Sequence, residues 1–258
     1  MALARCTGNR LEPGEAVPYR IAGSGRTDTG VHARGQVIAA ELPWRHDLAT
    51  LMRAWNAHLP KDIVICRLER APSGFHPRYS AQQRTYRYTV LTTFPQVPPT
   101  SLGLEEDGWN KERPPRSPLT DATAFHLPRT LDLAAMNLGA AWLVGEHDFA
   151  TFGRPPQGTN TVRTVTQAMW QEVHSDLPPL GQNAQRCLVF TISANAFLQR
   201  MVRNLVGTLL EVGLGQRTPE DVAAALVARE RQRSAPPVAP NGLSLEYVDY
   251  PAEVDPFL

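Results

Sequence analysis

The chain has 258 residues, of which 42% are hydrophobic and 20% charged, and its formal net charge at pH 7 is +1. The length allows one large domain or two modest ones, and no apolar run reaches the ~18 residues that span a bilayer. A net charge this small gives no global sign of nucleic-acid binding, so any basic surface must be local.

The first part of the chain predicts strands around one helix. Apolar residues recur at helical spacing over residues 48–59 and stop at Pro60, which predicts a helix that ends there. Segments rich in β-branched, aromatic or alternating apolar residues predict strands. These predicted strands are residues 18–22, 36–41, 62–68 and 85–90.

A Pro-rich, charged and weakly apolar segment then separates two parts of the chain. We interpret residues 95–128 as a linker or insertion. This sets an N-terminal half at residues 1–94 and a C-terminal half at residues 129–258.

The C-terminal half predicts helices and strands. Its first helix covers residues 131–144, with Thr130 as its cap and Gly145 at its end. A second helix covers residues 197–212, and Thr218-Pro219-Glu220-Asp221 opens a third, with Thr as the cap and Pro at the first position. The predicted strands here are residues 161–173, 186–194 and 244–250.

This order of elements predicts the fold class α+β with a largely antiparallel sheet. We expect two similar, mixed or antiparallel α/β halves that form a central cleft, which is a common place for a ligand site. Cys6, Cys66 and Cys187 have neither metal-site nor disulfide spacing, and the N-terminus lacks the apolar core of a signal peptide. We therefore expect a cytoplasmic protein without a metal or a membrane span.

The most informative feature is a carboxylate in a short turn. Asp28 lies between Gly25 and Gly30 and two residues after Arg26. A dinucleotide fingerprint needs a glycine where Asp28 stands, and a P-loop needs Lys-Ser/Thr after Gly30, where the chain has Val31-His32. An isolated Asp near a Gly is most simply a turn former.

Asp28-Thr29-Gly30 is also the triplet of aspartic proteases. Those enzymes use two such carboxylates that share a proton. The chain has no second Asp-Thr-Gly or Asp-Ser-Gly, and Arg26-Thr27 precedes the triplet where the proteases have an apolar strand. An aspartic protease is therefore a remote alternative.

Six motif blocks follow one another along the chain. They are GRTDTGVHA at 25–33, NAHLP at 56–60, FHPRYSA at 75–81 with YRY at 86–88, GEHDF at 145–149, NAFL at 195–198 with MVRNLVG at 201–207, and GLSL at 242–245. In this order they resemble the signature of the tRNA pseudouridine synthase A family. The resemblance covers most of residues 23–250.

The resemblance implies the pseudouridine synthase fold and the isomerisation of uridine to pseudouridine in the anticodon stem-loop of tRNA. It also implies a homodimer whose tRNA spans both subunits, and an enzyme that needs no cofactor. Because the target uridine lies in or beside a base-paired stem, the enzyme is expected to flip it out of the stack.

Five residues form the candidate site that the resemblance implies. Asp28 matches the family's catalytic aspartate, Arg203 its basic partner and Tyr86 its active-site tyrosine. An arginine nearby would favour the charged carboxylate, and the tyrosine would stack on the flipped uracil or take part in proton movement at C5. Arg26 is expected to contact phosphate or to hold the turn, and Leu245 to line the uracil pocket.

These assignments have alternatives. Arg203 falls at the edge of the apolar stripe of its helix, where a snorkelling arginine also fits. Tyr86 and Tyr88 alternate on one predicted strand, so one of them is expected to be structural, and a core role is also the default for Leu245. Asp28 fits attack on a ribose or base carbon as well as stabilisation of positive charge on the ribose.

The N-terminus departs from the family pattern. The family begins with a strand that carries a Tyr-Asp-Gly block, and the chain shows no such strand. We therefore expect a truncation or a misplaced start, which would expose the edge of a neighbouring strand. The functional alternative is then a catalytically impaired paralogue or a truncated form that binds RNA.

Overall fold

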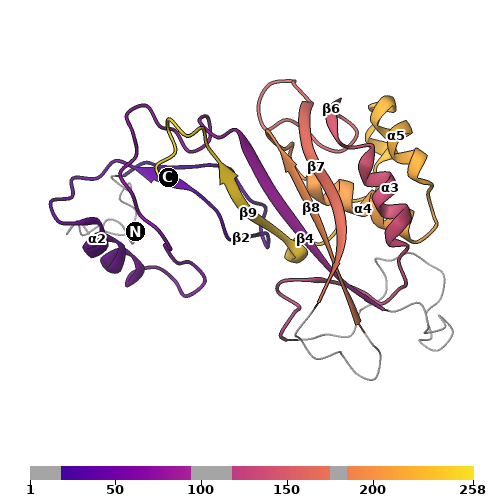
Figure 1. Cartoon of the computed structure of the whole chain (residues 1–258), viewed down its shortest axis with the longest axis horizontal. Helices are drawn as coiled ribbons and strands as arrows, with labels where there is room; N and C mark the ends of the chain where they lie inside the picture. Colours follow the sequence, from indigo (N-terminus) through magenta and orange to yellow (C-terminus); the bar gives the residue numbers. More distant parts are fainter. Residues whose placement is uncertain (1–18, 94–117, 175–184) are drawn as a thin grey trace, which may run out of the picture. The chain divides into compact units, whose positions relative to one another are not determined.

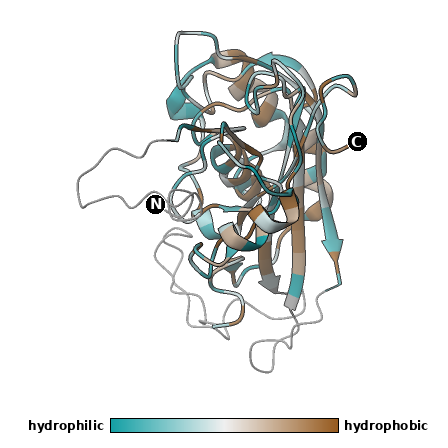
Figure 2. Cartoon of the chain, turned by 90° about the vertical axis from the view of Figure 1, so that its left-hand side faces the viewer, coloured by the Kyte–Doolittle hydropathy of each residue, from teal (hydrophilic) through white to brown (hydrophobic). Residues whose placement is uncertain are grey.

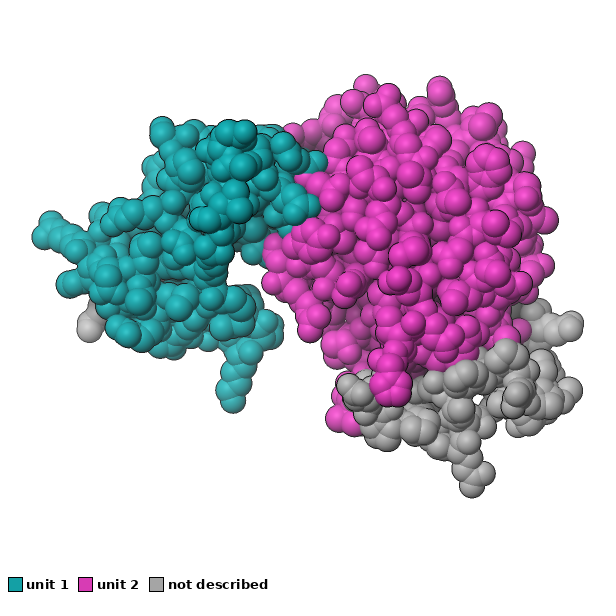
Figure 3. Space-filling model, viewed as in Figure 1, with its two compact units in different colours: residues 1–26, 36–82, 248–258 teal, residues 27–35, 83–247 magenta. Residues whose placement is uncertain are grey.

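The computed structural model describes residues 19–93, 118–174 and 185–258 (Figure 1). These residues form two compact units, each built from separate stretches of chain (Figure 3). Unit 1 comprises the described parts of Met1–Arg26, Gln36–Gln82 and Val248–Leu258, and unit 2 those of Thr27–Gly35 and Gln83–Tyr247. Most of the predicted linker, and the start of the chain where the missing strand was expected, lie outside the described residues. The division at residues 94 and 128 therefore stays a prediction.

Unit 1 contains a small antiparallel ribbon and one helix. Strands β1 (Ile21–Gly23) and β3 (Ile38–Ala40) lie in segments where strands were predicted, and they pair with each other. Helix α2 (Leu48–Asn56) begins at Asp47, whose carboxylate accepts a hydrogen bond from the Thr50 N–H at 2.7 Å. This is an N-cap, which satisfies one of the free N–H groups at the start of a helix.

The predicted strand at residues 62–68 is wrong. The backbone N–H of Ile65 donates to Asn56 Oδ1 at 2.8 Å, and its carbonyl accepts from Asn56 Nδ2 at 3.0 Å. One side chain at the end of α2 thus takes both backbone groups that a neighbouring strand would bind. The apolar side chains of Ile63 and Val64 are exposed, so the apolar run does not mark a buried strand.

Unit 2 is organised around a mixed sheet. Among the described residues its strand order is β2-β9-β4-β8-β7-β6, with β5 beside β4. The long β4–β8 and β7–β8 ladders are antiparallel, whereas β2–β9 and β4–β5 are parallel. The strands are β2 (His32–Ala33), β4 (Gln83–Thr93), β5 (Phe125–Leu127), β6 (Gly145–Asp148), β7 (Val162–Val173), β8 (Gln185–Ala194) and β9 (Leu243–Asp249).

Three helices cover one face of this sheet (Figure 1). They are α3 (Leu133–Ala141), α4 (Met201–Gly213) and α5 (Pro219–Ala228). Alternate residues of β8, among them Leu188, Phe190 and Ile192, are fully buried and form one core with Leu205 and Leu209 of α4. Hydrophobic stretches, brown in Figure 2, occur on both strands and helices of the chain. Helices packed on a mixed, largely antiparallel sheet confirm the predicted α+β class.

Two predicted helix starts in unit 2 are wrong. Helix α3 is capped by Asp132 rather than Thr130, because the Asp132 carboxylate accepts from the Ala135 N–H at 3.0 Å. Helix α4 begins at Met201 instead of residue 197, because the preceding backbone bonds elsewhere: Gln199 N–H donates to the Arg154 carbonyl at 2.9 Å. The predicted start of α5 is confirmed, with Thr218 and Asp221 forming a capping box.

Candidate active site

A tight turn positions Asp28 in unit 2. The Val31 N–H donates to the Asp28 carbonyl at 3.0 Å, and Gly30 has φ +83°. A Cβ at Gly30 would lie 2.9 Å from Pro240 Cγ, so both the dihedral angle and the space favour glycine there. The turn is thus fixed by its own backbone and by the segment that precedes β9.

The chain after the turn is attached to β9. Strand β2 pairs in parallel with β9, with Ala33 opposite Leu245. The N–H groups of Arg34 and Gly35 both donate to the Leu245 carbonyl, at 2.8 and 3.2 Å. A Cβ at Gly35 would lie 2.2 Å from the Glu246 carbonyl oxygen, so this close approach requires glycine.

Asp28 forms an ion pair with Arg203. Asp28 Oδ2 lies 3.1 Å from Arg203 Nη1, and the side chains are 34% and 14% exposed, respectively. Arg203 Nε donates to the Val238 carbonyl at 2.7 Å, and Val238 N–H donates back to the Arg203 carbonyl at 3.3 Å. The guanidinium is therefore held by the backbone and directed at a carboxylate, unlike a snorkelling side chain in solvent.

The position of Arg203 in its helix strengthens this interaction. Arg203 lies in the first turn of α4, which contains no acidic residue. A cation there opposes the positive end of the helix dipole, so a carboxylate from outside the helix is favoured. Asp28 supplies that charge. An arginine as its ion-pair partner also differs from the paired carboxylates of an aspartic protease.

Tyr86 lies within electrostatic reach of Asp28. Its ring contacts Phe197 edge to face, with centroids 5.1 Å apart. Burial raises the pKa of Tyr86 to about 12; Arg84 opposes this rise and the Asp28 charge adds to it. The Tyr86 hydroxyl is therefore protonated at neutral pH.

Tyr88 is the structural member of the tyrosine pair. It is fully buried, and its hydroxyl donates to the Ala239 carbonyl at 2.8 Å. Burial raises the pKa of Tyr88 far above its usual range, and Arg203 opposes this rise. Its polar atom is thus used to attach the segment before β9 to β4.

The other two predicted residues are placed differently. Arg26 belongs to unit 1 and is exposed, and its expected phosphate contact stays a prediction. Leu245 is 1% exposed and contributes its carbonyl to the support of the Asp28 segment. Its expected place in a uracil pocket likewise stays a prediction.

The sequence did not reveal two contacts of this site. The Val238 carbonyl that positions Arg203 is a backbone atom, which no residue-type pattern identifies. Phe197, which contacts Tyr86, occurs in the NAFL motif, but the motif alone does not indicate this contact. Within the described ranges, no three His, Cys, Asp or Glu side chains are grouped to hold a metal ion, and no helix is long and apolar enough to cross a membrane.

Comparison with known proteins identifies the class. The profile of a family described as tRNA pseudouridine synthase matches residues 140–251. tRNA pseudouridine synthase A of Streptomyces griseus is 38% identical over 241 residues, which cover 92% of this chain and 75% of the relative. tRNA pseudouridine synthase A of Cereibacter sphaeroides is 39% identical over 251 residues, covering 96% and 86%.

The fold and these matches define an isomerase of the pseudouridine synthase class. The chain belongs to the tRNA pseudouridine synthase family. The family resemblance expected from the sequence motifs is thereby confirmed.

Proposed function

We propose that this protein isomerises uridine to pseudouridine in tRNA and that Asp28 is the catalytic carboxylate. The observation that supports this best is the Asp28–Arg203 ion pair, built from two motif blocks of the family. In the reaction the bond from uracil N1 to ribose C1′ breaks and the bond from C5 to C1′ forms. The proton lost from C5 is balanced by the proton gained at N1, so no cofactor is consumed.

The contacts of Asp28 support different tasks for its two carboxylate oxygens. Oδ2 is bound by Arg203, whereas Oδ1 accepts no hydrogen bond from any described residue. Oδ1 is therefore the atom that faces the substrate, either as a nucleophile toward a ribose or base carbon or as a negative charge beside the positive ribose. Arg203 orients the carboxylate for either route.

Tyr86 fits a stacking and hydrogen-bonding role. A hydroxyl with a pKa of about 12 is a poor base at neutral pH, because only a very small fraction is ionised. Its ring offers an aromatic surface for the flipped uracil, and such stacking offsets part of the few kcal/mol that unstacking costs. The hydroxyl can still donate a hydrogen bond to the base.

The finer assignments follow from the motif resemblance. The target uridines are those of the anticodon stem-loop, and the protein acts in the cytoplasm as a homodimer whose tRNA spans both subunits. A dimer lets each chain contribute part of a basic surface, which agrees with a net charge of only +1.

The decisive experiment uses unmodified tRNA labelled with tritium at uridine C5. Pseudouridine formation releases the label, and carbodiimide adducts then map the modified positions. Asp28→Asn is expected to abolish release while tRNA binding survives, because the amide keeps the shape but not the charge. Glu253→Gln, at an exposed acid, is the matched control with wild-type release expected.

Full activity of Asp28→Asn would refute the assignment of the catalytic residue. A wild-type chain that binds tRNA without releasing tritium would instead favour the catalytically impaired RNA-binding alternative. The adduct map also decides the finer claim, since modification outside the anticodon stem-loop contradicts it.

A further inference from the structure

Three arginines from separate segments meet at the N-terminal end of α4, and we call Arg154, Arg200 and Arg231 the arginine cluster. Arg154 lies in the loop between β6 and β7, and its backbone forms an antiparallel bridge with Gln199, directly before Arg200. Arg231 Nη1 donates to the carbonyl of Thr151, in the same loop, at 2.7 Å. This loop therefore contacts the segments of both other arginines.

No acid in the described part of the chain pairs with the arginine cluster. Among residues 19–93, 118–174 and 185–258, no carboxylate forms an ion pair with any of its members, whereas nearby Arg229 pairs with Asp148 at 3.2 Å and Arg233 with Glu230 at 3.7 Å. Burial lowers the pKa of Arg231, and the positive charges of the other two members lower it further. The cluster thus concentrates like charge, which destabilises the protein unless an anion binds there.

The backbone at Arg200 is unfavourable for folding alone. Arg200 has φ 61° and ψ 8°, a left-handed conformation that residues with a Cβ disfavour. Its side chain forms no capping hydrogen bond, and the first turn of α4 has no acidic residue to offset the helix dipole. Strained residues of this kind concentrate at ligand sites.

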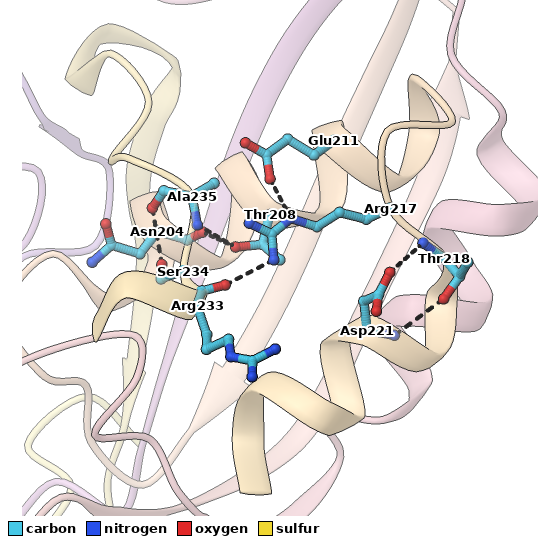
Figure 4. A network of polar contacts seen from close by, with 9 residues as sticks. All are labelled: Asn204, Thr208, Glu211, Arg217, Thr218, Asp221, Arg233, Ser234 and Ala235. Atoms are coloured by element: carbon cyan, nitrogen blue, oxygen red, sulfur yellow. Dashed lines mark hydrogen bonds and ion pairs between the residues drawn. The ribbon is translucent and has the colours of Figure 1, made fainter. Parts of the chain in front are cut away.

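Polar contacts hold the segments of the arginine cluster in place. Asn204, fully buried in α4, donates to the Phe152 carbonyl at 2.6 Å and so fixes the Arg154 loop. The segment after Arg231 is attached to α4 as well: Ala235 N–H donates to Thr208 Oγ1 at 3.1 Å (Figure 4). The three guanidinium groups therefore extend from anchored backbone.

We propose that the arginine cluster binds a backbone phosphate of the RNA substrate. This inference rests on the proposed function, since it takes tRNA as the ligand. Guanidinium groups bind phosphate in bidentate geometry, and a phosphate would relieve the repulsion among three cations. Arg200 precedes Arg203 by three residues at the same end of α4, so this phosphate belongs near the nucleotide that enters the Asp28 site.

The test is the affinity for an unmodified tRNA transcript, measured by fluorescence anisotropy over a range of salt concentrations. Arg154→Gln and Arg200→Gln are each expected to weaken binding about tenfold and to reduce the slope of log affinity against log salt, by at most the ~0.7–0.9 that one phosphate contact contributes. Arg233→Gln is the matched control, because it removes the same charge from an arginine that already has an acidic partner. Its affinity and salt dependence are expected to equal those of the wild type.

A double Arg154→Gln/Arg200→Gln variant with wild-type affinity and salt slope would overturn the inference, as would a wild-type chain that binds no tRNA. Melting temperatures identify any variant that fails to fold. Such a variant is replaced by Arg154→Lys or Arg200→Lys. The salt slope is then expected to equal that of the wild type, while affinity falls severalfold. Unchanged affinity of the lysine variant contradicts the bidentate contact. Tritium release tests the proposed function separately, so the two claims can fail independently.

Discussion

Arg203 Nη1 lies 3.1 Å from Asp28 Oδ2, although 175 positions of sequence separate the two residues. The turn at Gly30 fixes one partner, and the Val238 carbonyl fixes the other at 2.7 Å from Arg203 Nε. Both partners are therefore held by the backbone of the chain itself, and a charged group that is preorganised in this way can stabilise developing charge with little reorganisation.

Arg203→Ala is expected to reduce conversion much more than binding. Removal of the guanidinium leaves Asp28 without its orienting partner, and loss of one such contact typically costs about 100-fold in rate. Single-turnover tritium release measures the rate, and anisotropy measures the dissociation constant of tRNA. A variant that loses affinity but converts bound tRNA at the wild-type rate would make Arg203 a phosphate contact instead.

The same variant is expected to lower the free energy of unfolding by about 1–3 kcal/mol, because the Val238 carbonyl and Asp28 both lose a partner. Urea titration measures this change. Arg229→Ala is the control. The Arg229 side chain, which pairs with Asp148, is 66% exposed, and ion pairs of this kind contribute less than about 1 kcal/mol to the free energy of unfolding.

Substitutions of the two tyrosines of β4 are expected to have different effects, one on activity and the other on stability. Tyr86→Phe removes a hydroxyl near Asp28, so conversion is expected to fall about tenfold or more while stability changes little. Tyr88→Phe leaves the buried Ala239 carbonyl without its donor and is expected to cost about 1–3 kcal/mol of unfolding free energy. Tritium release and urea titration on both variants check this, and equal effects would contradict the division of roles.

Local signals in the sequence predicted a large part of the fold. The capping box at Thr218 and the long alternating strands were visible because each is set by residues close in sequence. The strand at residues 62–68 was wrong because Asn56, outside that segment, takes the backbone groups of Ile65. The short strands β2, β5 and β6 were not predicted because they contain no β-branched residue, so that they depend on their partners.

The candidate site was predictable only in part. Asp28 and Arg203 were selected by the family motifs, and the structure brings them together. The arginine cluster was missed because Arg154, Arg200 and Arg231 belong to separate segments with no shared motif. Their proximity is a consequence of the backbone bridge at Gln199 and of the hydrogen bond to Thr151, which are tertiary contacts.

The free energy of unfolding is expected to fall above pH 10, in part because Tyr86 ionises. The pKa of Tyr86 is about 12 in the folded protein, whereas the ordinary value for tyrosine is 10.0, so the folded state holds this proton more tightly. This stabilisation is fully present below pH 10 and is lost as the pH rises to about 12, by up to about 3 kcal/mol. Urea titrations at pH 9 and pH 11 should show a smaller loss in Tyr86→Phe than in the wild type. An equal loss in both proteins would contradict the raised pKa.

Arg200→Gly is expected to stabilise the protein and weaken RNA binding at the same time. Glycine adopts φ 61° without the Cβ penalty, and the substitution also removes one of three clustered cations. The expected gain is about 1 kcal/mol, or about 2–4 °C in melting temperature, with an affinity for tRNA reduced about tenfold. Differential scanning fluorimetry and anisotropy measure the two effects.

Arg229→Gly is the control that separates the effect of the backbone from the effect of the lost charge. Arg229 also has a positive φ, of 56°, but it pairs with Asp148, so this variant is expected to leave tRNA affinity unchanged. Equal losses of affinity in both glycine variants would show that backbone flexibility, and not the arginine cluster, governs binding.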